Sequence, residues 1–367
     1  MSKDLMSVKV KDKALLGLDI GNGYVKVVLS YNGEVERFVM PSGFVYESKA
    51  GFEELGISEV VKNQYHLVND NNPNPTVLLW DKEIGKNIYF ESLLGGKERY
   101  NTTEFSTFVS MVMHESLARL GVKNKNDVEL YIVSGVPSTH KGSKSEEDLK
   151  QTFLNAPKIR AKGELFTPRV KLVNILHQPI GTVLNRLFDK NGFSKDDEEH
   201  TIATFDIGTY TSDGAVIQKL DVFKVLKEGN FTENTGMSSV YEDIVDHIRV
   251  ETGSVIPFSN IEKQFDMDDY KISKRKYVKT KFVKEKSIKE KYDIIKNAMN
   301  SKWKEQDRFD EIILTGGGAK TFYPLFIEEG YEMILAEDNQ MANALGFYKF
   351  GLNLYSDVFE KEEVKTK

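Results

Sequence analysis

Two stretches in distant parts of the chain read LDIGNGYVK (residues 18–26) and FDIGTYTSD (residues 205–213). Each places an aspartate, Asp19 or Asp206, at the end of an apolar run, follows it with a glycine turn and continues into a second strand-like run. Glycine lets backbone approach an anion closely, and the N–H groups of such a turn can point at a phosphate. Paired carboxylates are hard oxygen ligands for hydrated Mg²⁺. The pattern therefore predicts a duplicated half-domain that closes on one phosphate-bearing ligand.

The composition predicts a soluble protein of two domains. The chain has 367 residues, too many for one compact core, of which 40% are hydrophobic and 29% charged. It has no cysteine, which excludes disulfides, iron–sulfur clusters and cysteine nucleophiles. The net charge of −6 argues against nucleic-acid binding by the whole surface. Because no apolar run is long enough for a membrane span and residues 1–13 lack a signal-peptide core, we expect a cytoplasmic protein without membrane attachment.

Hydrophobic periodicity predicts strands and helices on both sides of an acidic loop at residues 191–200. Residues 44–100 alternate short strand-like pieces with polar loops, which favours an inserted subdomain. Ser239 and Glu242 have the spacing of a capping box, which predicts a helix start after Gly236 that could bind an anion. The expected strands cover residues 14–18, 24–30, 34–39, 129–133, 170–175, 215–218, 222–226, 311–314 and 331–335, and the expected helices cover residues 103–120, 179–188, 292–303, 321–328 and 339–350.

The two common nucleotide-binding motifs are both missing. Lys26 stands where a dinucleotide fingerprint needs its third glycine, and GGGAKT at residues 316–321 lacks the glycine that precedes the lysine of a P-loop. Taken alone, each of these features also has an ordinary explanation. Each Asp–Gly stretch could be a common turn, Lys26 could be a solvent-facing lysine on a hairpin, and Gln178 could be a surface amide. A nucleotide site is favoured because these features and the triple glycine occur in an order that can surround one ligand.

Residues 271–291 form a basic tract in an otherwise acidic chain. The tract carries ten Lys or Arg against two Glu. Its aromatic residues are limited to Tyr277 and Phe282. A solvated face is therefore favoured over a nucleic-acid site, which would interleave more aromatic side chains with the charges.

The order of these motifs resembles that of the actin, sugar kinase and heat-shock chaperone ATPase superfamily. Within it, LDIGNGYVK and the chain length most resemble the bacterial actin-like proteins that segregate plasmids, the ParM (StbA) group. The resemblance spans residues 18–350 and implies an α/β fold of two domains with duplicated ribonuclease-H-like cores around a central nucleotide cleft. Domain I would comprise residues 1–185 and 339–367 with an insertion at about 44–100, and domain II residues 186–338 with an insertion at about 223–300.

The resemblance also implies a site for ATP or GTP with Mg²⁺. Asp19 and Asp206 would hold the metal through water. Lys26 would reach the phosphates and Gln178 would orient the attacking water, so that Gln178, Asp206 and Lys26 are the expected catalytic residues. The nucleotide-binding residues implied in this way are Asp19, Gly21, Asn22, Gly23, Tyr24, Lys26, Gly208, Thr209, Tyr210, Gly236, Gly316, Gly317 and Gly318.

The function implied is that of a filament-forming ATPase or GTPase that segregates plasmid DNA through a DNA-binding adaptor protein. The partners expected are copies of the chain and the adaptor, without direct contact to nucleic acid or membrane. Segments 44–100 and 271–291 are the candidates for contacts between subunits. A small-molecule kinase of the same superfamily and an actin-like scaffold that does not move cargo stay open as alternatives.

Overall fold

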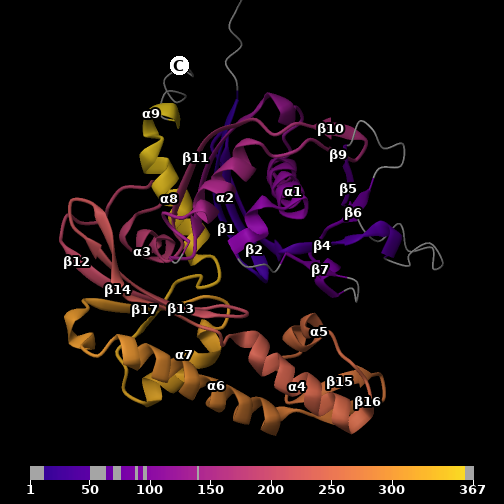
Figure 1. Ribbon diagram of the computed structural model, residues 1–367, viewed down its shortest axis with the longest axis vertical. Helices are drawn as coiled ribbons and strands as arrows, with labels where there is room; N and C mark the ends of the chain where they lie inside the picture. The colour runs from indigo at the N-terminus through magenta and orange to yellow at the C-terminus, as the bar shows by residue number, and fades with distance from the viewer. Residues whose placement is uncertain are drawn as a thin grey trace, which may run out of the picture.

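The chain folds into two lobes, drawn one above the other in the computed structural model of Figure 1. Each lobe is built on its own five-stranded sheet. Where the structure describes the chain, no helix combines the length and apolar character needed to cross a lipid bilayer. The residues described are 12–49, 63–68, 76–86, 90–93, 97–138 and 140–359.

The first sheet has the strand order β11-β8-β1-β2-β3. Its central strand β1 pairs antiparallel with β2 and parallel with β8. Asn32 and Gly33 both have positive φ, 50° and 81°, and form the tight turn between β2 and β3. The strands are β1 (Lys13–Ile20), β2 (Tyr24–Tyr31), β3 (Glu34–Pro41), β8 (Glu129–Val136) and β11 (Val170–His177).

The second sheet repeats this plan. Its order is β14-β13-β12-β17-β18, and its central strand β12 pairs antiparallel with β13 and parallel with β17. β12 is therefore the counterpart of β1, and the expected α/β fold with duplicated cores is confirmed. The strands are β12 (His200–Ile207), β13 (Ser212–Lys219), β14 (Phe223–Glu233), β17 (Glu311–Thr315) and β18 (Ile334–Leu335).

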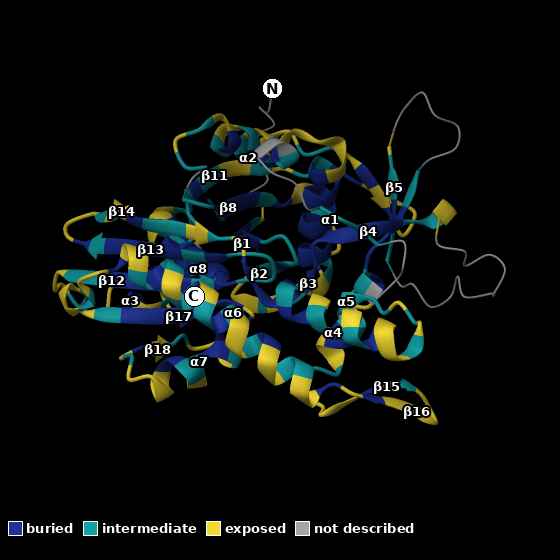
Figure 2. Cartoon of the chain, turned by 60° about the horizontal axis from the view of Figure 1, so that its bottom comes forward, coloured by how far each residue is buried: buried dark blue, intermediate teal, exposed yellow. Residues whose placement is uncertain are grey.

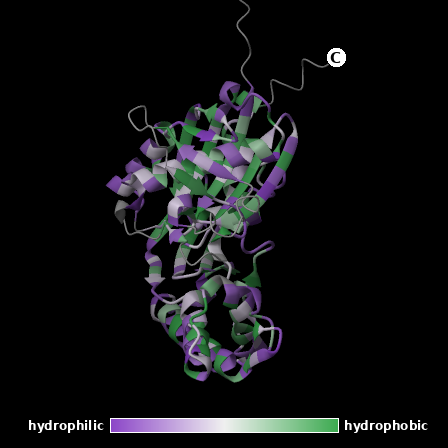
Figure 3. Ribbon diagram, turned by 90° about the vertical axis from the view of Figure 1, so that its right-hand side faces the viewer, coloured by the Kyte–Doolittle hydropathy of each residue, from purple (hydrophilic) through white to green (hydrophobic). Residues whose placement is uncertain are grey.

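Helices cover both faces of each sheet, which explains why the central strands β1 and β12 are largely apolar and buried. Leu16 of β1 packs in one cluster with α1 residues, whereas Leu15 faces α8. Likewise Phe205 of β12 packs with α4, α6 and α7, whereas Ile202 faces α3. Hydrophobic segments accordingly run through the interior of both lobes (Figure 3). The helices are α1 (Thr103–Arg119), α2 (Lys144–Leu154), α3 (Ile180–Leu187), α4 (Met237–Thr252), α5 (Phe258–Lys263), α6 (Lys281–Lys302), α7 (Ala319–Glu328), α8 (Ala342–Leu354) and α9 (Ser356–Phe359).

Helices α3 and α8 join the lobes by crossing at two glycines. A Cβ atom on Gly346 of α8 would overlap the carbonyl oxygen of Gly181 of α3, so the two backbones are in direct contact. Because α3 packs on the second sheet and α8 on the first, this crossing couples the lobes next to the cleft. The domain limits at residues 185 and 339 stay a prediction.

A small six-stranded sheet extends the first lobe in the order β10-β9-β5-β6-β4-β7. Its buried Trp80 packs edge-on against Phe108 of α1, with ring centroids 5.2 Å apart. Parts of segment 44–100 lie outside the described residues, but the sheet also recruits β9 and β10 from beyond that segment. Its strands are β4 (Gly43–Tyr46), β5 (Gln64–Leu67), β6 (Val77–Leu79), β7 (Glu91–Ser92), β9 (Ile159–Ala161) and β10 (Glu164–Phe166).

Some element limits differ from the sequence prediction. Helix α6 begins at Lys281 rather than at about residue 292, and a hairpin of β15 (Asp269–Ser273) and β16 (Lys276–Lys279) precedes it. The capping box predicted at Ser239 is wrong, because α4 already begins at Met237 and Ser239 lies inside its first turn. The short 3₁₀ helices are η1 (Glu47–Lys49), η4 (Ile84–Lys86), η5 (Lys97–Asn101), η6 (Lys125–Asp127) and η7 (Gln306–Arg308).

Candidate functional site

The two glycine turns lie on opposite sides of a cleft between the lobes. Both turns have the same geometry. The amide of Gly21 donates to the carbonyl oxygen of Tyr24 at 3.0 Å, and the amide of Gly208 donates to that of Thr211 at 2.8 Å. Both turns therefore follow their central strand in the same way, as expected of a duplication.

The turns also face each other closely. A Cβ atom on Gly23 would lie 2.5 Å from the hydroxyl of Thr209 in the opposite turn, so a larger residue there would displace the Thr209 side chain. Within the described residues, the amides of Asn22, Gly23, Thr209 and Tyr210 donate to no oxygen. Two free amides in each turn are thus available to hold the oxygens of an anion between the lobes.

Asp19, at the exit of β1, is 2% exposed and has two partners in the cleft. Lys26 Nζ lies 3.0 Å from its Oδ2, and Gln178 Nε2 donates to its Oδ1 at 2.9 Å. Burial alone would lower the pKa of Lys26, but the charges of Asp19 and Asp206 outweigh this and raise it. Lys26 is therefore a cation held between the carboxylates of both lobes.

Asp206, at the exit of β12, is the counterpart of Asp19. Burial is the main reason why its pKa is raised to about 7. The charge of Lys26 lowers this pKa, and the carboxylates of Asp19 and Asp213 raise it further. Asn343 of α8 donates through Nδ2 to its Oδ2 at 3.1 Å. Gly316, with φ +92°, lets the turn after β17 come so close that a Cβ atom there would overlap Oδ1 of Asp206.

The two carboxylates fit a hydrated magnesium ion. Asp19 and Asp206 reach one cleft from opposite lobes, and both are carboxylates, which Mg²⁺ prefers as ligands. In the described parts of the chain, no cluster of three or more acidic or histidine side chains could enclose a metal. Two carboxylates suit an ion that keeps most of its water ligands.

Arg99, which was not predicted from the sequence, lines the cleft and contacts the first turn. Arg99, in η5, donates to the side-chain oxygen of Asn22 and, through Nη2, to the carbonyl oxygen of Ile20 at 3.0 Å. Its guanidinium lies 4.8 Å from the centroid of the Tyr100 ring. No sequence motif links residue 99 to residues 20–22, so only the fold reveals this contact.

Asp213 and Asn343 are two further residues of the cleft that were not predicted as site residues. Asp213 is the cross-strand partner of Asp206, and it accepts hydrogen bonds from the hydroxyls of Thr211 at 2.8 Å and Thr232 at 2.5 Å. Burial nevertheless raises the pKa of Asp213. Two signals were present in the sequence, since Asp213 ends the second motif and Asn343 is a polar residue inside an apolar helix.

Two of the expected binding residues, Tyr24 and Gly236, lie at contacts with other parts of the protein. The hydroxyl of Tyr24 donates to Glu262 of α5. Gly236 precedes α4, whose first amides, of Met237 and Ser238, donate to the carbonyl oxygens of Gly208 at 3.1 Å and Thr209 at 2.7 Å. These amides support the second turn and are not free for an anion, contrary to the expectation from the sequence.

A more apolar pocket adjoins the cleft. It shares Thr209 and Tyr210 with the cleft and is also lined by Tyr241, Phe258 and Gly318. The triple glycine thus reaches both spaces, with Gly316 at the carboxylate of Asp206 and Gly318 at the pocket. A charged ligand end and an apolar ring could be bound side by side here.

Comparisons with known proteins agree with this architecture. Residues 17–181 match the family of actin-like proteins, N-terminal domain, and residues 204–327 match the C-terminal domain of the archaeal actin homologue MreB-like family. No curated protein matches the sequence.

Solved structures match over nearly the whole chain. Apo psk41 ParM has 23% identity and a TM-score of 0.70, over 94% of this chain and 99% of that one. The archaeal actin homologue Ta0583 in complex with ADP has 20% identity and a TM-score of 0.73, over 92% of this chain and 99% of that one. ParM in a 15-stranded filament from Clostridium botulinum has 18% identity and a TM-score of 0.70, over 93% of this chain and 99% of that one. The chain is therefore an actin-like protein with the fold of the ParM proteins.

Proposed function

We propose that the protein binds a nucleoside triphosphate with Mg²⁺ in the cleft, hydrolyses it and assembles into filaments. The observation that carries this proposal is the pair of equivalent turns with free amides, which bring Asp19, Lys26 and Asp206 together from two lobes. Phosphoryl transfer to water depends mainly on positioning and charge neutralisation, and these groups supply both. The complex of Ta0583 with ADP supports a nucleotide as the ligand.

Different residues of the cleft would have different roles in hydrolysis. Lys26 and the free amides of the two turns bind the phosphate oxygens. Gln178 uses its Nε2 to donate to Asp19, which leaves its Oε1 to accept a hydrogen from the attacking water. A bound Mg²⁺ would neutralise charge on the phosphates, held by Asp19 and Asp206.

The proton of the attacking water needs an acceptor other than Gln178. An amide has almost no basicity, so Gln178 can orient water but not deprotonate it. Asp213, paired across the strands with Asp206 and with a pKa raised by burial, lies where it can accept that proton. Turnover would remain slow until the geometry of the water improves, and filament assembly is the event we expect to improve it.

The filament proposal rests on kinship. The Clostridium botulinum ParM forms a 15-stranded filament, and the present chain shares its fold. By the same likeness we propose that the cargo is plasmid DNA, reached through a DNA-binding adaptor protein, with ATP or GTP as the fuel.

Sedimentation and light scattering with Mg-ATP, Mg-GTP and Mg-ADP test the proposal, together with phosphate release. We expect assembly with at least one triphosphate and loss of phosphate release in Asp206→Ala. A protein that stays monomeric at tens of micromolar with every triphosphate would contradict the filament. Phosphate transfer that requires an added sugar or acid would instead identify a small-molecule kinase.

A further inference from the structure

The basic tract separates into two parts that differ in how their charges are paired. On α6 most lysines have partners, because Lys289 and Lys296 bind Glu329, Lys291 binds Asp243, and Lys284 donates to backbone oxygens. In the hairpin of β15 and β16, here called the basic hairpin, no lysine or arginine forms an ion pair with a described residue. The basic residues of the hairpin are Lys271, Lys274, Arg275, Lys276 and Lys279.

The basic hairpin is exposed as well as unpaired. It stands at the edge of the second lobe, away from the body of the protein (Figure 2). Tyr277 is 55% exposed and lies among the charges, and Phe282, 79% exposed, follows directly on α6. A charged ribbon with exposed aromatic rings is suited to an acidic surface that also offers apolar contacts.

The same lobe carries such a surface, here called the acidic groove. It lies between η7, the start of β17 and the end of α7, and none of its lining residues, all described, is basic. Phe309, Met333 and Ile334 supply apolar lining, and Ile334 is 39% exposed. Its acidic residues are Asp307, Asp310, Glu311 and Glu332.

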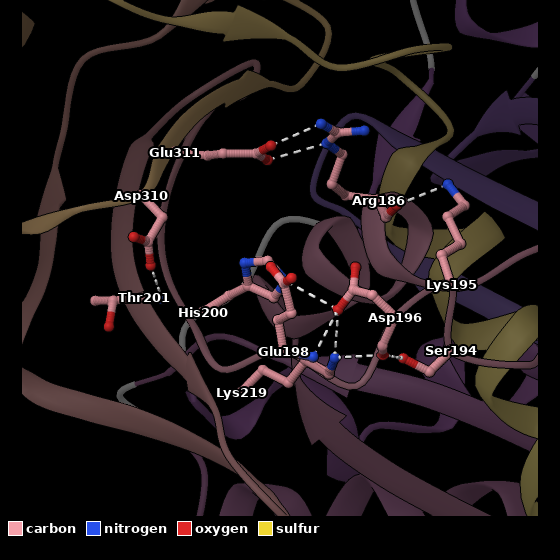
Figure 4. A network of polar contacts seen from close by, with 10 residues as sticks. All are labelled: Arg186, Ser194, Lys195, Asp196, Glu198, His200, Thr201, Lys219, Asp310 and Glu311. Atoms are coloured by element: carbon pink, nitrogen blue, oxygen red, sulfur yellow. Dashed lines mark hydrogen bonds and ion pairs between the residues drawn. The ribbon is translucent and has the colours of Figure 1, made fainter.

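Two of these acidic residues are hydrogen-bonded within a network of polar side chains, and the other two have no ion-pair partner among the described residues. Glu311 accepts both guanidinium hydrogen bonds of Arg186, at 2.9 and 2.6 Å, and Asp310 accepts the amide of Thr201 at 2.6 Å (Figure 4). Asp307 and Glu332 form no ion pair with any described residue. The network fixes the shape of the groove while Asp307 and Glu332 keep their charge available.

The two surfaces cannot meet within one molecule. The basic hairpin precedes α6 and the acidic groove follows it, so they lie at opposite ends of this 22-residue helix. A helix of that length spans about 33 Å. Figure 1 shows β15 and β16 at the lower right and β17 on the left-hand side.

We propose that the basic hairpin of one copy docks in the acidic groove of the next copy. This contact rests on the proposed filament function and on the complementary charge of the two surfaces. Two different patches at opposite ends of a molecule make a head-to-tail contact, which extends into a filament when the rotation between copies does not close a ring. Lys274, Arg275 and Lys276 would face Asp307 and Glu332, with Tyr277 against the apolar side of the groove.

Paired charge reversals test this contact. The hairpin variant is Lys274→Glu, Arg275→Glu, Lys276→Glu, and the groove variant is Asp307→Lys, Glu332→Lys. Each variant alone should raise the critical concentration for assembly at least about tenfold, because like charges would face each other. An equal mixture should assemble again, because each hairpin then finds an oppositely charged groove. Lys286→Glu, at an exposed position in the second turn of α6, is the matched control and should assemble like the unmodified protein.

The outcomes separate this inference from the proposed function. Nucleotide binding by both variants would show that they are folded. If the unmodified protein assembles and either variant does too, or if the mixture of inactive variants fails to assemble, the hairpin–groove contact is overturned. If the unmodified protein never assembles, the filament function fails and this inference with it. If the hairpin variant assembles normally but loses binding to duplex DNA, the partner of the hairpin is nucleic acid and the inference is wrong.

Discussion

Lys26 and Asp213 occupy the same position in the two halves of the protein. Lys26 is the cross-strand partner of Asp19 on the β1–β2 pair, and Asp213 is the cross-strand partner of Asp206 on the β12–β13 pair. One duplicated hairpin thus presents a cation to the cleft and the other presents an acid. This difference suits a site in which Lys26 neutralises charge on the phosphates and Asp213 accepts the proton of the attacking water.

Substitutions at these equivalent positions should affect different steps. Lys26→Met removes a charge that binds phosphate and should weaken nucleotide affinity about 100-fold. Asp213→Asn keeps the shape but removes the proton acceptor, and should slow single-turnover phosphate release about 100-fold with affinity nearly unchanged. Titration with a fluorescent nucleotide and rapid-mixing phosphate release measure the two effects. Equal loss of affinity in both variants would refute the division of roles.

Gly316→Ala should destabilise the protein and disturb Asp206. The new methyl group would overlap Oδ1 of Asp206, and a φ of +92° is strained for alanine. We expect a loss of about 2 kcal/mol in the free energy of unfolding, measured in urea. The matched control is Gly317→Ala, whose Cβ would meet no atom within 4 Å and which should change stability by less than about 0.5 kcal/mol. Similar losses in the two variants would contradict the close approach at Gly316.

Arg99→Gln should loosen the first turn without unfolding the lobe. It removes the charge-assisted hydrogen bonds to Asn22 and to the Ile20 carbonyl. The expected result is nucleotide affinity lowered about tenfold. Arg160→Gln is the control, because the Nη1 of Arg160, in the small sheet away from the cleft, donates to the nearby Gly163 carbonyl at 3.0 Å. Unchanged affinity in Arg99→Gln would show that the turn holds its shape unaided.

His114 should make the protein less stable in acid. This buried residue of α1 packs edge-on against Tyr65 and Phe166, and burial, aided by Lys125 and Lys162, lowers its pKa from 6.5 to about 4. Between pH 4 and pH 6.5, His114 stays neutral in the folded protein but is protonated in the unfolded chain. The stabilisation is therefore full above pH 6.5 and is lost as the pH falls toward 4.

A comparison with His114→Phe isolates this contribution from other acid effects. Phenylalanine keeps the ring contacts but has no group that can bind a proton. Between pH 7.5 and pH 5, the free energy of unfolding of the unmodified protein should fall by roughly 2 kcal/mol more than that of the variant. Parallel pH profiles of urea denaturation would show that His114 does not titrate in this way.

The sequence was sufficient to predict the parts of the protein that are local in the chain. The runs before Asp19 and Asp206 are largely apolar because helices cover both faces of their strands, and this pattern can be read without a structure. Asn32-Gly33 likewise signals its turn directly. The structure brings Asp19, Lys26, Gln178 and Asp206 into one cleft, as their order in the chain led us to expect.

Contacts made across the fold could not be read in this way. Arg99 reaches Asn22 from a different segment, and Asn343 reaches Asp206 from α8, with no periodicity or spacing that links either pair. The error at Ser239 has a similar origin. The start of α4 is fixed by carbonyl oxygens of the second turn, which replace the predicted side-chain cap. Tertiary hydrogen bonds outweighed a local signal there.

The most direct test of the central claim is the position of the metal in a crystal of the protein with Mn²⁺ and a non-hydrolysable nucleoside triphosphate. The anomalous signal of Mn²⁺ should give a single peak between the carboxylates of Asp19 and Asp206, bridged to both through water and next to the phosphates. A peak bound by one lobe only, or outside the cleft, would contradict the account.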